Sequence, residues 1–311
     1  MKKICIALMG ALVLGGVTSC GGSENSSKPV EDAMIKAYTR DTTSGTRDGF
    51  FSTIGFKEAV SSDEVLVKDV IPVESNGDML QSIKNDEFGI GYASLSGLEG
   101  VKPLSYEGVT PTEENVINGT YGLKRNFNYV IRTDFDSEQE KQIVDAFVQY
   151  MGTQEGKTTI KANGGIIDIK STDPKWSDLK DTLPITKEDN SNITIKFGGS
   201  TSVSKIAQAL SSEFSTKCGN FKVQHNHTGS GDAFKRVQGT EKDSQNKLDI
   251  GFASREFKLS DKEPCAEGSY GRICIDAIAV IVNNKNTITE INSEQLHSIY
   301  DGTFTKWSEV E

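Results

Sequence analysis

Four loops rich in glycine and hydroxyl residues constrain the fold of this chain most strongly. Each stands where a short apolar strand pattern gives way to a helix pattern. One covers residues 198–203 and follows the alternating run 193–197. Another covers residues 228–234 and follows the run 221–225. Strands that alternate with helices are typical of α/β proteins. The chain is therefore predicted to be an α/β protein.

The other two loops cover residues 248–255 and 40–50, and the second of these combines Arg40 with Ser44, Gly45 and Thr46. A helix N-terminus has unpaired N–H groups and a partial positive charge, so it binds oxyanions readily. An arginine adds charge-assisted hydrogen bonds. A single loop of this kind is equally explained by an ordinary Ser/Thr helix cap with arginines at the surface. Four loops of the same chemistry favour an oxyanion site.

Length and charge restrict the kind of site. The chain has 311 residues, of which 35% are hydrophobic and 25% charged, which is enough for two lobes with sizeable cores. The formal net charge of -10 argues against a nucleic-acid-binding surface and against a broad field that attracts anions. An anion site must therefore be local, formed by helix ends and a few arginines.

The N-terminus has the pattern of a targeting signal. Two lysines precede a short apolar stretch, and small residues lead to Cys20. Residues 1–20 resemble a bacterial lipoprotein signal, with Cys20 as the lipidated residue. The alternative is a plain secretory signal in which Cys20 is incidental. Residues 21–29 are predicted to be a flexible tether.

The remaining cysteines and the histidines give no metal-site pattern. Cys218, Cys265 and Cys274 permit one disulfide and one free thiol outside the cytosol, and the sequence does not select the pair. His225 and His227 are interpreted as solvent-facing strand residues, because no Cys or carboxylate pattern accompanies them. No metal and no cofactor is predicted.

The loops resemble those of the phosphate-binding lipoproteins of bacterial phosphate ABC importers. The matching motifs are Gly-Ser-Thr-Ser-Val at 199–203, Gly-Ser-Gly at 229–231, Asp-Ile-Gly-x-Ala-Ser-Arg at 249–255 and Arg-x-x-x-Ser-Gly-Thr-Arg at 40–47. Weaker similarities at 90–92, 276–283 and 295–307 extend the resemblance over nearly all of the chain after the signal. Each motif alone is weak, and the set is specific.

The resemblance implies a two-lobed α/β protein of the periplasmic-binding-protein type II fold, with a ligand cleft between the lobes. It implies capture of inorganic phosphate, delivery to ABC permease subunits, an extracytoplasmic location with a lipid anchor on Cys20, and a monomeric state. The phosphate ligands carried over from the family are Arg40, Ser44, Gly45, Thr46, Ser202, Val203, Ser230, Ser254 and Arg255. Candidate acceptors for a phosphate proton are Glu74, Asp232 and Glu256.

The order of the two halves departs from the family pattern. The segment that resembles the family's first half is 193–310, and the one that resembles its second half is 38–165. This order predicts a circular permutant, which proteins tolerate where their termini lie close together. One lobe is then expected to combine residues 30–93 with 273–311, and the other to span 94–272. The alternative is a fragment or fusion of a longer repeated protein.

Other functions have weaker support. No Gly-x-Ser-x-Gly elbow and no phosphate-binding Gly-x-x-x-x-Gly-Lys-Ser/Thr loop occurs, and three histidines offer no convincing catalytic triad, so the chain is not predicted to be an enzyme. Sulfate or molybdate remains an alternative ligand. A surface lipoprotein without a role in transport is a further alternative, because a fold does not determine a function.

Overall fold

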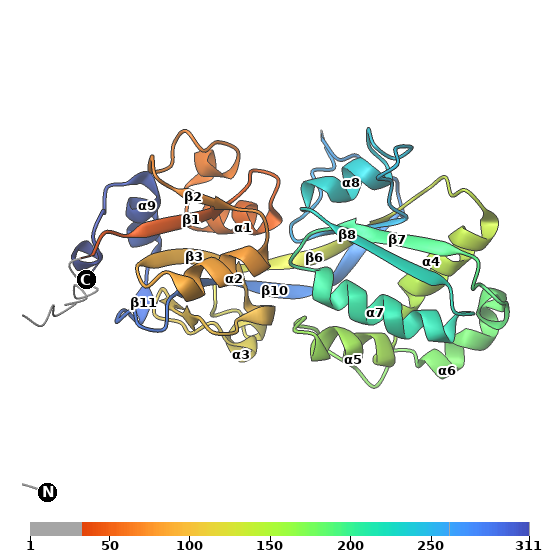
Figure 1. The fold of residues 1–311 in the computed structure, drawn as a ribbon. Coiled ribbons are helices and arrows are strands. Elements are labelled where there is room, and N and C mark those ends of the chain that lie inside the picture. The colour runs from red at the N-terminus through yellow and green to blue at the C-terminus, as the bar shows by residue number, and fades with distance from the viewer. Residues whose placement is uncertain (1–32, 261, 311) are drawn as a thin grey trace, which may run out of the picture.

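The computed structural model of the protein describes residues 33–260 and 262–310. The predicted signal at 1–20, the lipidation site Cys20 and the tether at 21–29 lie outside the described residues. Figure 1 shows two lobes joined by long strands that run from one lobe into the other. Within the described residues, no helix is long and apolar enough to cross a membrane.

A sheet of nine strands extends through both lobes. Its order is β2 (Ile71–Val73), β1 (Lys36–Arg40), β3 (Gly89–Ser94), β10 (Tyr270–Val282), β6 (Lys124–Ile131), β9 (Ile250–Ala253), β7 (Thr194–Gly199) and β8 (Lys222–His227), with β4 (Lys102–Pro103) also paired to β10. β1 is parallel to β2 and β3, and β7 is parallel to β8 and β9. β10 is antiparallel to β3 and β6, and β6 is antiparallel to β9. The predicted α/β class is confirmed.

The helices cover the sheet in both lobes (Figure 1). The first lobe contains α1 (Gly45–Thr53), α2 (Asn76–Asn85), α3 (Glu113–Ile117) and α9 (Ser293–Asp301), and a two-stranded sheet of β5 (Ser105–Tyr106) and β11 (Glu290–Ile291). The second lobe contains α4 (Glu138–Met151), α5 (Gln154–Ala162), α6 (Trp176–Leu179), α7 (Ser204–Lys217) and α8 (Gly231–Val237). Short 3₁₀ helices cover Lys57–Val60, Leu95–Gly97, Lys180–Thr182, Pro184–Lys187 and Trp307–Glu309.

Helix α4 shows how local sequence determines an element. The Ser137 side chain caps its N-terminus by accepting a hydrogen bond from the Glu140 N–H at 3.1 Å. The apolar stripe that includes Ile143 and Phe147 is fully buried. An apolar stripe at this spacing forms one helix face. The helix therefore begins and ends where the pattern predicts, and its stripe packs in the core.

The first lobe has an aromatic core. The ring of Phe50 stacks on Tyr92 with centroids 4.1 Å apart, and Tyr300 meets Phe50 edge-on at 5.4 Å. All three are fully buried, and burial of a side chain as large as Phe stabilises a fold by about 1.5–3 kcal/mol. The same cluster includes Leu104 and Leu123. The core of this lobe thus continues past residue 94, where the boundary between the lobes is predicted.

The second lobe has a separate core around Phe147, Phe197, Phe214 and Trp176. Strands β6 and β10 connect it to the first lobe. β10 pairs with β3 at one end and with β6 at the other, and its register with β6 shifts between Arg272 and Cys274. These two strands are the only part of the sheet path that joins β3 to β9 within the described residues.

The two ends of the described chain meet on the first lobe. Met34 forms a bridge with Lys306, and the Ile35 N–H donates to the Thr305 carbonyl at 2.8 Å. The Trp307 N–H donates to the Ala33 carbonyl at 3.2 Å. The first lobe is therefore closed by residues from both ends of the sequence.

Two interpretations of single residues need correction. His225 and His227 are half-buried rather than solvent-facing: Nδ1 of His225 lies 3.1 Å from Nε2 of His227, and Nδ1 of His227 lies 3.0 Å from the Ser200 carbonyl oxygen. Burial lowers the pKa of both imidazoles to about 4. The three cysteines that follow Cys20 are all free thiols, so the permitted disulfide is absent from the described residues.

Candidate anion-binding site between the lobes

The loop before α1 is built around the Ser44 side chain. Ser44 caps the helix: its Oγ accepts from the N–H of Thr46 at 3.2 Å and from that of Arg47 at 3.4 Å. Ser44, Gly45 and Thr46 are all buried. The helix-cap alternative is therefore correct for the Ser44 oxygen, while the hydroxyl of Thr46 remains free to face the second lobe.

The two arginines of this loop are buried and have different roles. The Arg47 guanidinium donates to the carbonyl oxygens of Arg40 at 2.7 Å, Ala59 at 2.8 Å and Ser62 at 3.0 Å, so it braces the loop from inside. Arg40 donates to the carbonyls of Val73 at 3.2 Å and Glu74 at 2.7 Å. Carbonyl partners fix a guanidinium without neutralising its charge, and Arg47 in addition pairs with the Asp63 carboxylate.

Arg40 also faces the second lobe. Its Nη1 lies 3.5 Å from the Thr201 hydroxyl oxygen. Burial lowers the pKa of Arg40, and the neighbouring Asp41 carboxylate, 3.6 Å from Nη2, opposes that shift. Because arginine pKa values start so high, the side chain stays cationic.

The second lobe contributes three buried serines. The Ser230 Oγ accepts from the Ser254 N–H at 2.9 Å, and the two Oγ atoms lie 3.1 Å apart. The Ser202 N–H donates to the Ser200 Oγ at 3.2 Å, and the fully buried Val203 directly precedes α7. This second lobe therefore presents hydroxyl groups on rigid turns.

The loop after β7 requires glycine. Gly199 has φ +95°, and a Cβ there would lie 2.3 Å from the Phe252 carbonyl oxygen. Only glycine adopts this conformation and allows this approach without strain. The turn then directs the backbone toward Ser202.

The two groups of predicted residues meet between the lobes. The Thr46 Oγ1 lies 3.0 Å from the Ser202 Oγ. A Cβ on Gly45 would lie 2.4 Å from the Ser230 Oγ and 2.6 Å from the Ser254 Oγ. The chain thus brings together residues more than 150 positions apart in sequence. We call Thr46, Ser202, Ser230, Ser254 and Arg125 the interlobe cluster.

Arg125, on β6, is the residue of this cluster that sequence reasoning missed. Its Nη1 donates to the Ser254 Oγ at 3.3 Å, and its Nη2 donates to the Ser202 Oγ at 3.1 Å. Its Nε and Nη2 donate to the Asp276 carboxylate on β10 at 3.0 and 2.8 Å. Both side chains of this ion pair are buried.

One signal in the sequence pointed to this ion pair. Asp276 interrupts the apolar run of β10, and a buried carboxylate requires a cation or several donors. Burial raises the pKa of Asp276, and the attraction of Arg125 together with the hydrogen bond from Ser94 at 2.7 Å opposes that shift. Arg125 itself, next to Lys124, had the pattern of a solvated strand end.

Asn76, at the start of α2, is a second missed residue. Its Nδ2 donates to the Ser202 Oγ at 2.6 Å. The serine oxygen thereby has Thr46, Asn76 and Arg125 as neighbours. A hydroxyl surrounded by this many donors indicates a site whose natural partner is a strong acceptor.

Arg255 does not join the cluster. Its guanidinium forms a bidentate pair with Glu263, with both N–O distances at 2.7 Å. The Glu263 carboxylate cancels its charge, and its Nε lies 3.9 Å from Asp48. Ser254 therefore lies beside the other predicted residues, and its neighbour Arg255 does not.

The predicted proton acceptors do not hydrogen-bond to the cluster. Glu256 accepts from Asn126 at 2.7 Å and from Asn128 at 3.3 Å, Asp232 accepts from the Thr228 hydroxyl, and the exposed Glu74 contributes only its backbone carbonyl, to Arg40. Among the described residues, no carboxylate hydrogen-bonds to the hydroxyls of Ser202, Ser230 or Ser254. No group of three or more His, Cys, Asp or Glu residues in the described chain could hold a metal ion. Hydroxyl, amide and guanidinium donors together form a site for an anion.

Comparisons with known proteins point to one family. Residues 185–311 match the model of the PBP superfamily domain. The chain is 25% identical to the phosphate-binding protein PstS 2 of Streptococcus pneumoniae serotype 4, over 100% of this chain and 99% of that protein. It is 26% identical to PstS 2 of Streptococcus agalactiae serotype V, over 99% of both. The chain is similar to phosphate-binding proteins from end to end.

A solved structure gives the same result for the fold. A phosphate-binding protein of a phosphate ABC transporter from Streptococcus pneumoniae TIGR4 superimposes with a TM-score of 0.63 and 25% identity, covering 90% of this chain and 100% of that one. The protein has the periplasmic-binding-protein type II fold. The predicted resemblance is confirmed on both counts.

The predicted circular permutation is not confirmed. The alignments with the two PstS 2 proteins run through both partners almost end to end, so this chain and those relatives share one order of segments. Protein SphX of Synechococcus elongatus aligns over only 42% of this chain and 39% of its own length, at 28% identity. A reversed order relative to other members of the family stays a prediction.

Proposed function

We propose that this chain captures inorganic phosphate between its lobes and delivers it to an ABC importer. The observation that carries the proposal is the interlobe cluster, in which Thr46 of one lobe meets Ser202 of the other, and Ser202 and Ser254 both accept from the guanidinium of Arg125. A tetrahedral oxyanion offers several acceptor oxygens, so donors from two sides match it. The end-to-end similarity to proteins named phosphate-binding supports phosphate over other oxyanions.

The ligand residues in this proposal are the predicted ones other than Arg255, with Arg125 and Asn76 added. Arg40 supplies charge from the first lobe, while Ser44, Gly45 and Thr46 form the helix end beside it. Ser202, Val203, Ser230 and Ser254 form the opposite wall, and Arg255 supports that wall through its pair with Glu263. Closure brings the Gly231 N–H to the Thr43 carbonyl at 3.1 Å.

Capture in this proposal breaks no covalent bond. Bound phosphate replaces the contacts that the hydroxyls make with one another and holds the two lobes together. The lobes close onto it by a bend in the connecting strands β6 and β10. The closed form then docks on the permease subunits. We infer that the protein works as a monomer outside the cytoplasm, held at the membrane by a lipid on Cys20. Loss of membrane retention in Cys20→Ala tests the anchor.

Calorimetry with phosphate, sulfate, molybdate and arsenate tests the function. Phosphate is expected to bind one site per chain, and Arg40→Ala is expected to weaken binding by roughly 10- to 150-fold, because a hydrogen bond to a charged group contributes about 1.5–3 kcal/mol. Lys222→Ala is the control, since Lys222 is an exposed cation on β8 outside the cluster. Tighter binding of sulfate or molybdate than of phosphate contradicts the proposal.

Two further measurements separate the alternatives. Turnover of generic phosphoesters that Ser202→Ala abolishes would identify a hydrolase. No saturable binding of any oxyanion would favour a surface lipoprotein without a role in transport. Thermal unfolding of each variant verifies that a lost signal reflects the site rather than the fold.

A further inference from the structure

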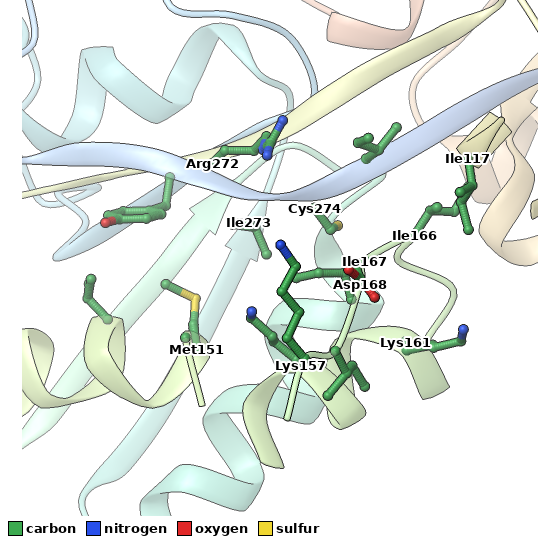
Figure 2. A pocket seen from close by; sticks show the side chains of 16 residues that line it. Ile117, Met151, Lys157, Lys161, Ile166, Ile167, Asp168, Arg272, Ile273 and Cys274 are labelled. Atoms are coloured by element: carbon green, nitrogen blue, oxygen red, sulfur yellow. The ribbon is translucent and has the colours of Figure 1, made fainter. Parts of the chain in front are cut away.

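A second hollow lies beside the connecting strands. It has a volume of about 830 Å³ and is lined by α4, α5, the stretch 166–170 and the β10 segment 272–275. Arg272 is among the lining residues, and Figure 2 shows Lys157 reaching from α5 toward β10, with Ile166 and Ile117 to one side. The volume falls in the range of small-molecule sites. None of the lining residues belongs to the interlobe cluster, so we treat this hollow as a separate feature and call it the hinge cavity.

The hinge cavity is cationic in a chain whose net charge is -10. Its lining includes Lys157, Lys161, Lys170 and Arg272 against the single carboxylate of Asp168. Lys157 pairs with Asp173 at 2.6 Å and Lys161 pairs with Glu113 at 2.8 Å. Within the described chain, the side chains of Lys170 and Arg272 make no ion pair or hydrogen bond. Two cations are thus available to a ligand.

The rest of the wall is apolar. Ile117 is 62% exposed and Ile169 is 37% exposed, both unusually high for isoleucine. Val148, Met151 and Ile167 continue the apolar surface toward the floor at Ile273. Exposed apolar surface gathered in one hollow marks a binding site more often than isolated exposed residues do.

From this combination we infer that the hinge cavity binds an anionic amphiphile: one carboxylate or phosphate head group on a single acyl chain. The head group lies between Arg272 and Lys170, and the chain lies along Ile117, Ile167 and Ile169. A purely polar anion leaves the isoleucines exposed, and a neutral apolar molecule leaves the two cations without a partner. Only a ligand with both parts matches both sets of side chains.

The cavity also touches both lobes. Ile117 belongs to α3, whose neighbour Val116 packs in the core of the first lobe, while Lys157 and Lys161 belong to α5 of the second. The ion pair between Glu113 and Lys161 joins the lobes at its rim. A ligand that contacts both walls changes the relative stability of open and closed lobes, so its binding is coupled to that of an oxyanion in the cleft.

Decanoate is the probe for this site, and decyltrimethylammonium, with the same chain length and the opposite charge, is the control ligand. Calorimetry is expected to show one saturable decanoate site per chain and no comparable site for the cation. The double variant Arg272→Glu, Lys170→Glu is expected to weaken decanoate binding at least tenfold. Lys222→Glu, on an exposed lysine of β8, is expected to leave it unchanged.

Ile117→Asn tests the apolar wall without adding a charge beside the cations, and it is also expected to weaken binding. Thermal unfolding of the same samples verifies folding independently of phosphate, so loss of the decanoate site is distinct from failure of the phosphate proposal. Flotation with phosphatidylglycerol vesicles distinguishes the source of the ligand: retention that the double variant abolishes identifies a membrane lipid, and decanoate binding without retention identifies a free acid. Equal binding of both probes, or decanoate binding unchanged in the double variant, overturns the inference.

Discussion

The two lobes hold the arginines of their predicted ligand loops in different ways. In the first lobe, backbone carbonyls fix Arg40, so its positive charge remains available, while Arg47 behind it also pairs with Asp63. In the second lobe, Glu263 holds Arg255 with two hydrogen bonds and cancels its charge. The second lobe instead contributes neutral hydroxyls. The comparison teaches that unpaired positive charge comes from Arg40 of the first lobe, while the second lobe and Arg125, which is itself paired with Asp276, supply hydrogen-bond geometry.

The lobes also differ in their response to pH. The second lobe buries Asp249, whose pKa burial raises to about 6, and the pair His225 and His227, whose pKa values burial lowers to about 4. The buried ionisable groups described in the first lobe are arginines and tyrosines, such as Tyr92, whose pKa burial raises further from neutrality. Mild acid is therefore expected to act on the second lobe first.

The largest effect is expected for the residue that both lobes share. Arg125→Ala leaves the Asp276 carboxylate buried without its cation, and breaking a buried pair in this way destabilises a protein by about 3–5 kcal/mol. Phosphate binding is expected to be lost as well. Urea unfolding measures the first effect and calorimetry the second.

A double variant separates stability from binding. Arg125→Met with Asp276→Leu removes both charges, and such replacements are often neutral or stabilising. Recovered stability without recovered phosphate binding shows that Arg125 acts on the ligand. Recovery of both contradicts its place in the site.

The next largest effect concerns Asp249. Its Oδ2 accepts from the Lys196 N–H at 2.7 Å, and its folded pKa of about 6 lies above the ordinary value of 3.8. Between these values the folded state holds a proton that the unfolded state has released, so stability falls as pH rises from about 4 to 6, by about 3 kcal/mol. Asp249→Asn is expected to abolish this slope. Unfolding free energies measured from pH 4 to 7 check it, and identical slopes in both proteins contradict it.

A smaller effect is expected from closing the gap between the lobes. In Gly45→Ala the new Cβ meets the oxygens of Ser230 and Ser254 at 2.4 and 2.6 Å, so the lobes cannot approach as closely. Phosphate affinity is expected to fall about tenfold, equivalent to ~1.4 kcal/mol, with little change in stability. Gly97→Ala is the control, because no atom lies within 4 Å of its added Cβ. Equal phosphate affinities of the two variants would show that close contact between the lobes is not needed for binding.

An effect of opposite sign is expected at the histidine pair. Because the folded pKa of His227 is depressed to about 4, its contribution to stability is present above the ordinary value of 6.5 and is lost as pH falls toward 4. This slope opposes that of Asp249. His227→Asn is expected to reduce the loss of stability in acid. Thermal unfolding at roughly pH 4.5 and pH 7, near the folded and above the ordinary pKa of histidine, measures this loss.

Much of the fold could be predicted from the sequence, because amphipathic periodicity and glycine turns are local. The loop before α7 has the predicted position, and the apolar periodicity of residues 138–151 coincides with α4. Helix α5 was not predicted, since its residues Gln154–Ala162 carry few apolar side chains and it is held by packing against α4 and α7. The continuation of the first core to Leu123 likewise depends on contacts between distant segments.

The residues of the candidate site could be predicted where they belong to a loop with a recognisable sequence motif. They could not be predicted where a single side chain reaches the site from a distant segment without a motif. Ser202, Ser230 and Ser254 stand in recognisable turns, and the structure brings them together. Arg125 and Asn76 reach the same place from a strand and a helix start that have no such pattern. Arg255 stood in a motif, yet Glu263, eight residues later, determines its orientation.

The meeting of the chain ends on the first lobe matters for anyone who would convert this protein into an optical sensor. Residues 33–35 hydrogen-bond to residues 305–307, so fluorescent domains fused before and after these segments would both move with the first lobe. The distance between them would stay nearly constant during closure. A reporter inserted among residues 164–190 of the second lobe, paired with one at either end, would instead convert lobe motion into a change of energy transfer.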